Sequence, residues 1–240
     1  MVDRGEAASF FFVTVVLVLS VRLIGRVTGA APRRIEDVYW WGGIFFLVVG
    51  RLAYVASSSP GLLTDLAVLV RFTDGLDPIA GAAAGLAWAM WKSGGGRTDG
   101  SLWVASVVGL VLAAVAYDLT CSVRASCYGV PASGPLGFPM HGLAEPRMPT
   151  PVFEGVVLLV LLGVTVRLLD RWDAGRAGWA LLAAASLTRL AALPLTVQGL
   201  ELSQALVLLI AATVAAGLAI ATTHRVVASY ASDRGSRPKA

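Results

Sequence analysis

The run LWVASVVGLVLAAVAY, from Leu102 to Tyr117, contains no charged side chain. A helix that crosses a membrane needs about 20 mostly apolar residues, because hydrocarbon offers no water to bind backbone polar groups. Six comparable runs flank it, at about residues 8–24, 38–56, 78–91, 152–169, 178–193 and 202–222. The pattern predicts an all-α integral membrane protein with about seven transmembrane helices.

The composition agrees with this class. Hydrophobic residues make up 57% of the 240 residues and charged residues 14%, whereas soluble domains carry roughly 25% charged residues. A shorter apolar stretch at residues 61–70 contains Asp65, and we expect an interfacial or re-entrant helix there. Residues 1–223 are predicted to form a single transmembrane domain, followed by a basic, disordered tail at 224–240.

The basic residues alternate between the two sides of the predicted bundle. Most follow the first, third, fifth and seventh runs: Arg26, Arg33, Arg34, Lys92, Arg97, Arg167, Arg171, Arg176, Arg225, Arg234, Arg237 and Lys239. Basic loops face the cytoplasm, so the N-terminus is predicted to lie outside and the C-terminus inside. The net charge of +4 is explained by this topology, and we expect no nucleic-acid partner.

Two polar clusters lie near the predicted outer ends of the second and third runs. In the first, Arg51 and Tyr54 end a helix, and an arginine there either binds a lipid phosphate or reaches to the interface. In the second, Asp77 and Pro78 suit the cap and first turn of a helix. A capped helix start is the favoured interpretation of this second cluster.

A long outer loop is predicted at about residues 118–151. Loops of this length without periodicity are usually functional or disordered. The polar and cysteine residues that it contains are Cys121, Arg124, Cys127, Tyr128, His141, Glu145 and Arg147. Glu154 lies just inside the next run, and it either needs a partner such as Arg147 or Arg124 or is a first-turn acid favoured by the helix dipole.

The last two clusters lie at the outer ends of the sixth and seventh runs. Arg189 is the arginine least expected to lie on the surface without a role. In the other cluster, Glu201 and Ser203 suit a helix cap, and Gln204 lies one turn into the membrane. The two cysteines lack the spacing of a zinc motif, and they are either a disulfide or buried free thiols. We therefore predict no metal and no cofactor.

The order of these motifs resembles that of the bacterial prolipoprotein diacylglyceryl transferases. Gly50-Arg51-Leu52-Ala53-Tyr54 resembles the family segment GGRLGY, and Arg147-Met148-Pro149-Thr150-Pro151-Val152-Phe153-Glu154 resembles RHPTQLYE. The stretch from Cys121 to Pro131 resembles the family signature, and Leu202-Ser203-Gln204 the opening of its last span. Arg189 falls where the family places an arginine, and the resemblance covers roughly residues 38–221.

This resemblance implies a multi-pass enzyme of the bacterial inner membrane that needs no cofactor. It would transfer a diacylglyceryl group from phosphatidylglycerol to the cysteine thiol of a lipoprotein precursor. The implied catalytic residues are Arg189, Arg124 and Glu154. The reaction needs positive charge on the leaving phosphate and a base for the thiol, and Glu154 would orient one of the three arginines Arg51, Arg147 and Arg189. The implied substrate-binding residues are Arg51, Tyr54, Tyr128, Gly129, Arg147 and Gln204.

The chain departs from the family at two chemically important positions. Ile79 stands where the family has a histidine, and Asp118 where its signature has an arginine, so Arg124 is expected to replace that arginine. The alternative function is therefore a non-catalytic relative that binds phospholipid as an accessory subunit of a membrane complex. A transporter is disfavoured because the chain shows no matching halves.

Overall fold

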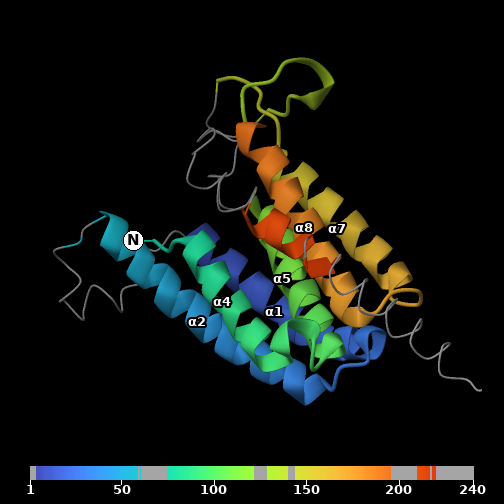
Figure 1. Cartoon of the computed structure of the whole chain (residues 1–240). Coiled ribbons are helices and arrows are strands. Elements are labelled where there is room, and N and C mark those ends of the chain that lie inside the picture. Colours follow the sequence, from blue (N-terminus) through green and yellow to red (C-terminus); the bar gives the residue numbers. More distant parts are fainter. Residues whose placement is uncertain are drawn as a thin grey trace, which may run out of the picture.

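The computed structural model describes residues 4–58, 60, 75–121, 129–139, 144–195, 210–216 and 218–219, and this part of the chain is almost entirely helical. The long helices are α1 (Arg4–Thr28), α2 (Pro32–Ser58), α4 (Pro78–Ser93), α5 (Gly100–Leu119), α7 (Thr150–Leu168) and α8 (Ala174–Ala192) (Figure 1). Short 3₁₀ turns occur at η3 (Gly94–Gly96), η4 (Gly134–Leu136) and η5 (Leu193–Leu195).

Within the described ranges, five helices are long and apolar enough to cross a membrane, namely α1, α2, α5, α7 and α8 with its η5 extension. This confirms an all-α fold with several helices that could cross a membrane. The expected third span, α4, has 16 residues, fewer than the roughly 20 that a perpendicular span needs. Of the expected seventh span, residues 210–216 and 218–219 are helical. The stretch 61–70 and the tail 224–240 lie outside the described residues.

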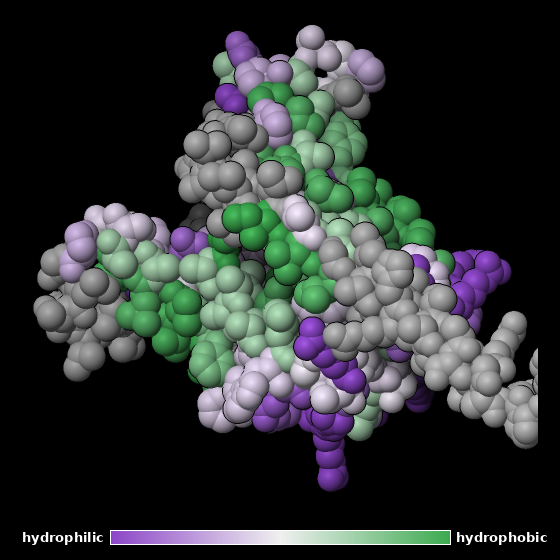
Figure 2. Space-filling view, viewed as in Figure 1, coloured by the Kyte–Doolittle hydropathy of each residue, from purple (hydrophilic) through white to green (hydrophobic). Residues whose placement is uncertain are grey.

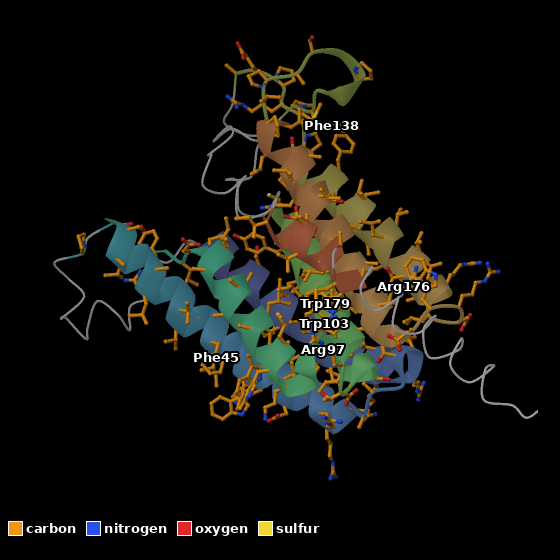
Figure 3. All side chains as sticks on the ribbon, viewed as in Figure 1. Phe45, Arg97, Trp103, Phe138, Arg176 and Trp179 are labelled. Atoms are coloured by element: carbon orange, nitrogen blue, oxygen red, sulfur yellow. The ribbon has the colours of Figure 1, made fainter. Side chains whose placement is uncertain are left out.

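Helix α5 lies at the centre of the bundle, between α1, α7 and α8 (Figure 1). Its buried residues point in every direction around its axis, as expected of a helix surrounded by other helices. Trp103 is fully buried and contacts Trp179 of α8, with the ring centroids 4.4 Å apart (Figure 3). A side chain at Gly178 would collide with the Trp103 ring, so this glycine allows α8 to approach α5.

Helices α2 and α4 form a second layer through small residues. Gly42 faces Gly85, and a side chain at Gly81 would collide with Phe46. Close approach of this kind is how helices associate in a membrane, where the hydrophobic effect gives no attraction between them. A hydrogen bond also joins these two helices, from Asp77 N at the start of α4 to the carbonyl of Gly50 in α2.

The start of α4 agrees with its sequence. Asp77 Oδ1 accepts hydrogen bonds from Ile79 N and Ala80 N, both at 2.9 Å, and Pro78 occupies the first turn. The favoured interpretation of this cluster as a helix cap is therefore confirmed. The helix ends at Gly94, which adopts φ 59° and closes the last turn.

The basic loops that follow α1, α4 and α7 meet at one end of the bundle. Arg34 pairs with Asp99 at 2.5 Å and joins the start of α2 to the start of α5, while Lys92 pairs with Asp37 at 3.5 Å. Trp179 Nε1 donates to Gly95 O at 2.9 Å, which joins α8 to η3. Figure 2 shows hydrophobic residues across the middle of the visible face and hydrophilic ones towards its lower end.

The packing of α2 on α4 is tested by adding one methyl group. Gly81→Ala would place a Cβ 2.8 Å from the Phe46 ring, and such overpacking costs about 1–3 kcal/mol. We expect a lower midpoint of thermal unfolding in detergent. The matched control is Gly43→Ala, since a Cβ there meets nothing within 4 Å and alanine favours helices by about 1 kcal/mol. Equal midpoints for the two variants would contradict this packing.

Candidate functional site

Arg189 of α8 lies between two buried carboxylates from two other helices. Its Nη1 donates to Glu154 Oε2 at 2.6 Å and approaches Asp118 Oδ1 at 3.5 Å. The side chains of Glu154 and Asp118 are 3% and 5% exposed, whereas that of Arg189 is 48% exposed. The two carboxylates therefore bind the guanidinium on its buried side, while about half of the Arg189 side chain stays accessible.

The three residues meet because three helix ends meet. Asp118 lies in the last turn of α5, Glu154 near the start of α7, and Arg189 in the last turn of α8, all at the upper end of the bundle in Figure 1. Next to Glu154, the glycine at 155 leaves room for Asp118, because a Cβ there would already touch the Asp118 side chain at 3.5 Å. A bulky residue at this position would separate α5 from α7.

The charge of this cluster is not balanced. Two carboxylates face one guanidinium, so the cluster holds one acidic side chain more than it holds basic ones. Asp118 Oδ2 is buried and has no hydrogen-bond partner within the described part of the chain. The hydrogen bonds that the structure records for Arg189 all use Nη1. Its Nε and Nη2 groups are therefore left for another acceptor.

The outer loop is anchored beside this cluster. Val130 N donates to Leu195 O at 3.1 Å, and Thr150 Oγ1 donates to the same carbonyl at 2.9 Å. Together these bonds join the loop and the start of α7 to the end of α8. The base of the loop is held by backbone bonds, from Gly129 N to Met148 O and from Met148 N to Val130 O.

Arg147 and Gly129, both predicted to bind substrate, contact each other. Arg147 Nη1 donates to Gly129 O at 3.3 Å, and the Arg147 backbone exchanges two hydrogen bonds with Phe138. A side chain at Gly129 would collide with Thr150 and with the carbonyls of Met148 and Leu195. Figure 3 shows Phe138 at the loop end of the molecule, far from Trp103 and Trp179. The positions of Gly129 and Arg147 therefore shape the loop.

Arg51 and Tyr54 form a separate group on α2. Arg51 is 2% exposed and donates from Nη1 to Gly75 O at 2.9 Å, and its guanidinium carbon lies 5.6 Å from the centre of the Tyr54 ring. The two alternatives weighed for Arg51, a lipid phosphate or the interface, stay predictions. The arginine is buried, where it connects the end of α2 to the approach of α4.

The structure brings together only part of the predicted site. Glu154 is paired with Arg189, one of the three arginines that the resemblance implied it would orient, and not with Arg147 or Arg124, the partners expected from its position. Asp118 was noted only as the replacement of a family arginine, and its role as a partner of Arg189 was missed. Arg124, Tyr128, His141, Glu201, Ser203 and Gln204 lie outside the described residues.

The cysteines and metal ligands are described in part. Cys121 is disulfide-bonded, which decides for this residue between a disulfide and a free thiol, and Cys127 lies outside the described residues. Among the residues that the structure places, no group of three or more His, Cys, Asp or Glu side chains could hold a metal ion. The chemistry available at the site is that of arginine and two carboxylates.

Comparison with protein-family models and with curated protein sequences gives no match for this chain.

The ion cluster can be tested by changing its charges singly and together. Arg189→Met leaves two buried carboxylates without their cation, and we expect it to lower the free energy of unfolding by about 3 kcal/mol. Adding Asp118→Asn and Glu154→Gln to that variant should restore most of the loss, because neutral replacements of a buried ion group are often nearly neutral. The measurement is denaturant or thermal unfolding in detergent. A triple variant that is no more stable than Arg189→Met would show that the three charges are not coupled.

Proposed function

We propose that this protein binds the headgroup of a phospholipid at Arg189 and acts as a diacylglyceryl transferase-like protein. The substrates would be phosphatidylglycerol and the cysteine thiol of a lipoprotein precursor, in the plasma membrane of a bacterium. The observation that carries this proposal is the state of Arg189, which Glu154 holds at 2.6 Å while 48% of its side chain is exposed. A guanidinium that a carboxylate already orients can donate two hydrogen bonds to a phosphate.

The reaction makes a definite demand on this arginine. A thiolate sulfur would form a bond to the glycerol carbon, and the bond between that carbon and its phosphate oxygen would break. Negative charge then develops on the leaving glycerol phosphate, and a fixed arginine beside it lowers the barrier. The thiol proton needs a base, and Asp118 and Glu154 are the described carboxylates nearest to Arg189.

A second candidate function is a non-catalytic lipid-binding subunit of a membrane complex. Asp118 favours it, because a carboxylate occupies the position where the resembled family has an arginine. Arg51 and Arg147 favour it as well, since each donates to a backbone carbonyl of the protein. Both functions include a phospholipid bound at Arg189, and they differ in whether transfer follows.

The test is a transfer assay with purified full-length protein, labelled phosphatidylglycerol and a peptide that contains the lipoprotein cysteine. We expect transfer by the wild type and a loss of about 100-fold or more in Arg189→Ala, the usual effect of removing a group that stabilises developing charge. Arg97→Ala is the matched control, since Arg97 lies at the opposite end of the bundle, and it should keep full activity.

The other outcomes are equally informative. Protein that binds phosphatidylglycerol through Arg189 but transfers nothing would favour the accessory subunit. Lipid binding that is the same in wild type and Arg189→Ala would refute the proposal in both forms.

We also propose seven transmembrane helices with the N-terminus outside. The basic loops at one end of the bundle support this orientation, because such loops stay in the cytoplasm. The disulfide at Cys121 supports it too, since the opposite end would face an oxidising compartment.

The orientation can be measured by labelling single introduced cysteines with a membrane-impermeant maleimide. Ser133→Cys in the exposed outer loop should react in intact cells, whereas Arg171→Cys between α7 and α8 should react only after lysis. The reverse pattern would invert the topology. Tags at the two termini should be accessible from opposite sides of the membrane. Tags accessible from the same side would contradict an odd number of spans.

A further inference from the structure

An open hollow lies at the basic end of the bundle, beside the turn that joins α1 to α2 (Figure 1). Its volume is about 320 Å³, at the lower end of the range of small-molecule sites, about 300–1,000 Å³. The residues that line it are Arg22, Gly25, Arg26, Ala30 and Pro32. None of these five is acidic, so the lining is basic.

The two arginines of the hollow are not used by the protein itself. Arg22 and Arg26 are one helical turn apart on α1, so their side chains leave the same face of the helix. Both side chains are exposed, and within the described residues neither forms an ion pair. By contrast, Arg34 at the same end pairs with Asp99. The two guanidinium groups are therefore available to an anionic ligand.

The hollow opens onto an apolar face of α1. Leu19, Leu23 and Val27 are exposed, and their spacing of four residues places them in one row beside the two arginines. Arg22 lies six residues before the end of α1, which corresponds to about 9 Å along the helix axis. A long basic side chain at such a position reaches the level of lipid headgroups while its stem lies against apolar surface. A ligand with both a phosphate and hydrocarbon chains fits this combination better than a free phosphate does.

A second hollow at the same end lacks this combination. Its volume is about 360 Å³, and the residues that line it are Arg167, Leu168, Asp170 and Arg171. It also has two arginines, but the carboxylate of Asp170 lies among them and would repel a phosphate. The two hollows thus match in size and in number of arginines and differ in their acid, which makes the second a control for the first.

We propose that the hollow at Arg22 and Arg26 binds the headgroup of an anionic phospholipid from the leaflet at the basic end, which is the cytoplasmic leaflet in the proposed orientation. The guanidinium groups donate hydrogen bonds to the phosphate oxygens, and the acyl chains lie along the row that contains Leu23. Basic pockets on the cytoplasmic side of membrane proteins bind anionic headgroups in this way. The site is at the opposite end of the bundle from Arg189, and it does not depend on the proposed transfer reaction.

The experiment counts the lipids bound to the purified full-length protein by native mass spectrometry. Phosphatidylglycerol and phosphatidylcholine with identical acyl chains are compared, because only the first carries a net negative charge. We expect Arg22→Gln/Arg26→Gln to weaken the binding of one phosphatidylglycerol by about tenfold or more, the ratio that corresponds to one hydrogen bond to a charged group. Binding of phosphatidylcholine should be unchanged. Glutamine is chosen because its helix propensity is close to that of arginine.

Two controls separate this site from general attraction by the basic end. Arg167→Gln/Arg171→Gln removes the same number of charges beside the second hollow, and it should leave the affinity for phosphatidylglycerol within about twofold of the wild type, since exposed charges more than a Debye length of about 10 Å away are largely screened. Glycerol 3-phosphate carries the phosphate without acyl chains, and at the same concentration as the lipid it should displace none from the wild-type protein.

The results that overturn the inference are definite. Equal weakening in the two double variants would show that only the total charge matters, and unchanged binding in Arg22→Gln/Arg26→Gln would show that these arginines hold no lipid. Displacement by glycerol 3-phosphate would replace the lipid by a soluble phosphate.

The proposed function is tested separately through Arg189→Gln. This variant should lose a different phosphatidylglycerol, and adding Arg22→Gln/Arg26→Gln to it should cause the same further loss as in the wild type. Lipid binding that is unaffected by Arg189→Gln would refute the proposed function and leave this site intact. Equal binding of phosphatidylglycerol and phosphatidylcholine by Arg189→Gln would refute this site alone, without any change at Arg22 or Arg26.

Discussion

The contact of Arg189 with two buried carboxylates joins three helices at one end of the bundle. Arginine is the residue suited to this place, because one planar guanidinium can serve acceptors on two sides at once. The contact also explains why Glu154 and Asp118 are tolerated so close to hydrocarbon, since both acids lie beside the same cation, Arg189. The outer loop is attached to the same end of the bundle, because Val130 and Thr150 donate hydrogen bonds to the carbonyl of Leu195.

The two ends of the bundle are built on different physical principles. At the end with the basic loops, Arg34 and Asp99 pair at the surface, where the 57% exposed arginine side chain limits the energy gained. At the other end, the side chains of Asp118 and Glu154 are 5% and 3% exposed, so water screens their attraction to Arg189 less. In the layers between, glycine contacts and the buried tryptophans set the spacing of the helices.

Local patterns in the sequence predicted the helices well. The apolar runs located the cores of α1, α2, α5, α7 and α8, and Asp77-Pro78 predicted the start of α4, because a helix cap depends on neighbours along the chain. Partners across helices were harder to predict. Glu154 was recognised as an acid in need of a cation, yet Arg189 follows it by 35 residues and no spacing rule joins them. Asp118 was interpreted only as the replacement of a family arginine, because its contact with Arg189 depends on how α5 packs against α8.

The base of the outer loop is held by main-chain hydrogen bonds that do not depend on side-chain identity. Gly129, Val130 and Ala132 pair with Met148 and Pro146 through backbone atoms alone. Substitutions between Ala132 and Pro146 that keep these bonds should therefore leave the three helix ends in place, except at Gly137, where a Cβ would collide with the carbonyl of Ala132. The same property makes this loop a suitable place to insert an epitope or a fluorescent reporter, which would be displayed beyond the bundle.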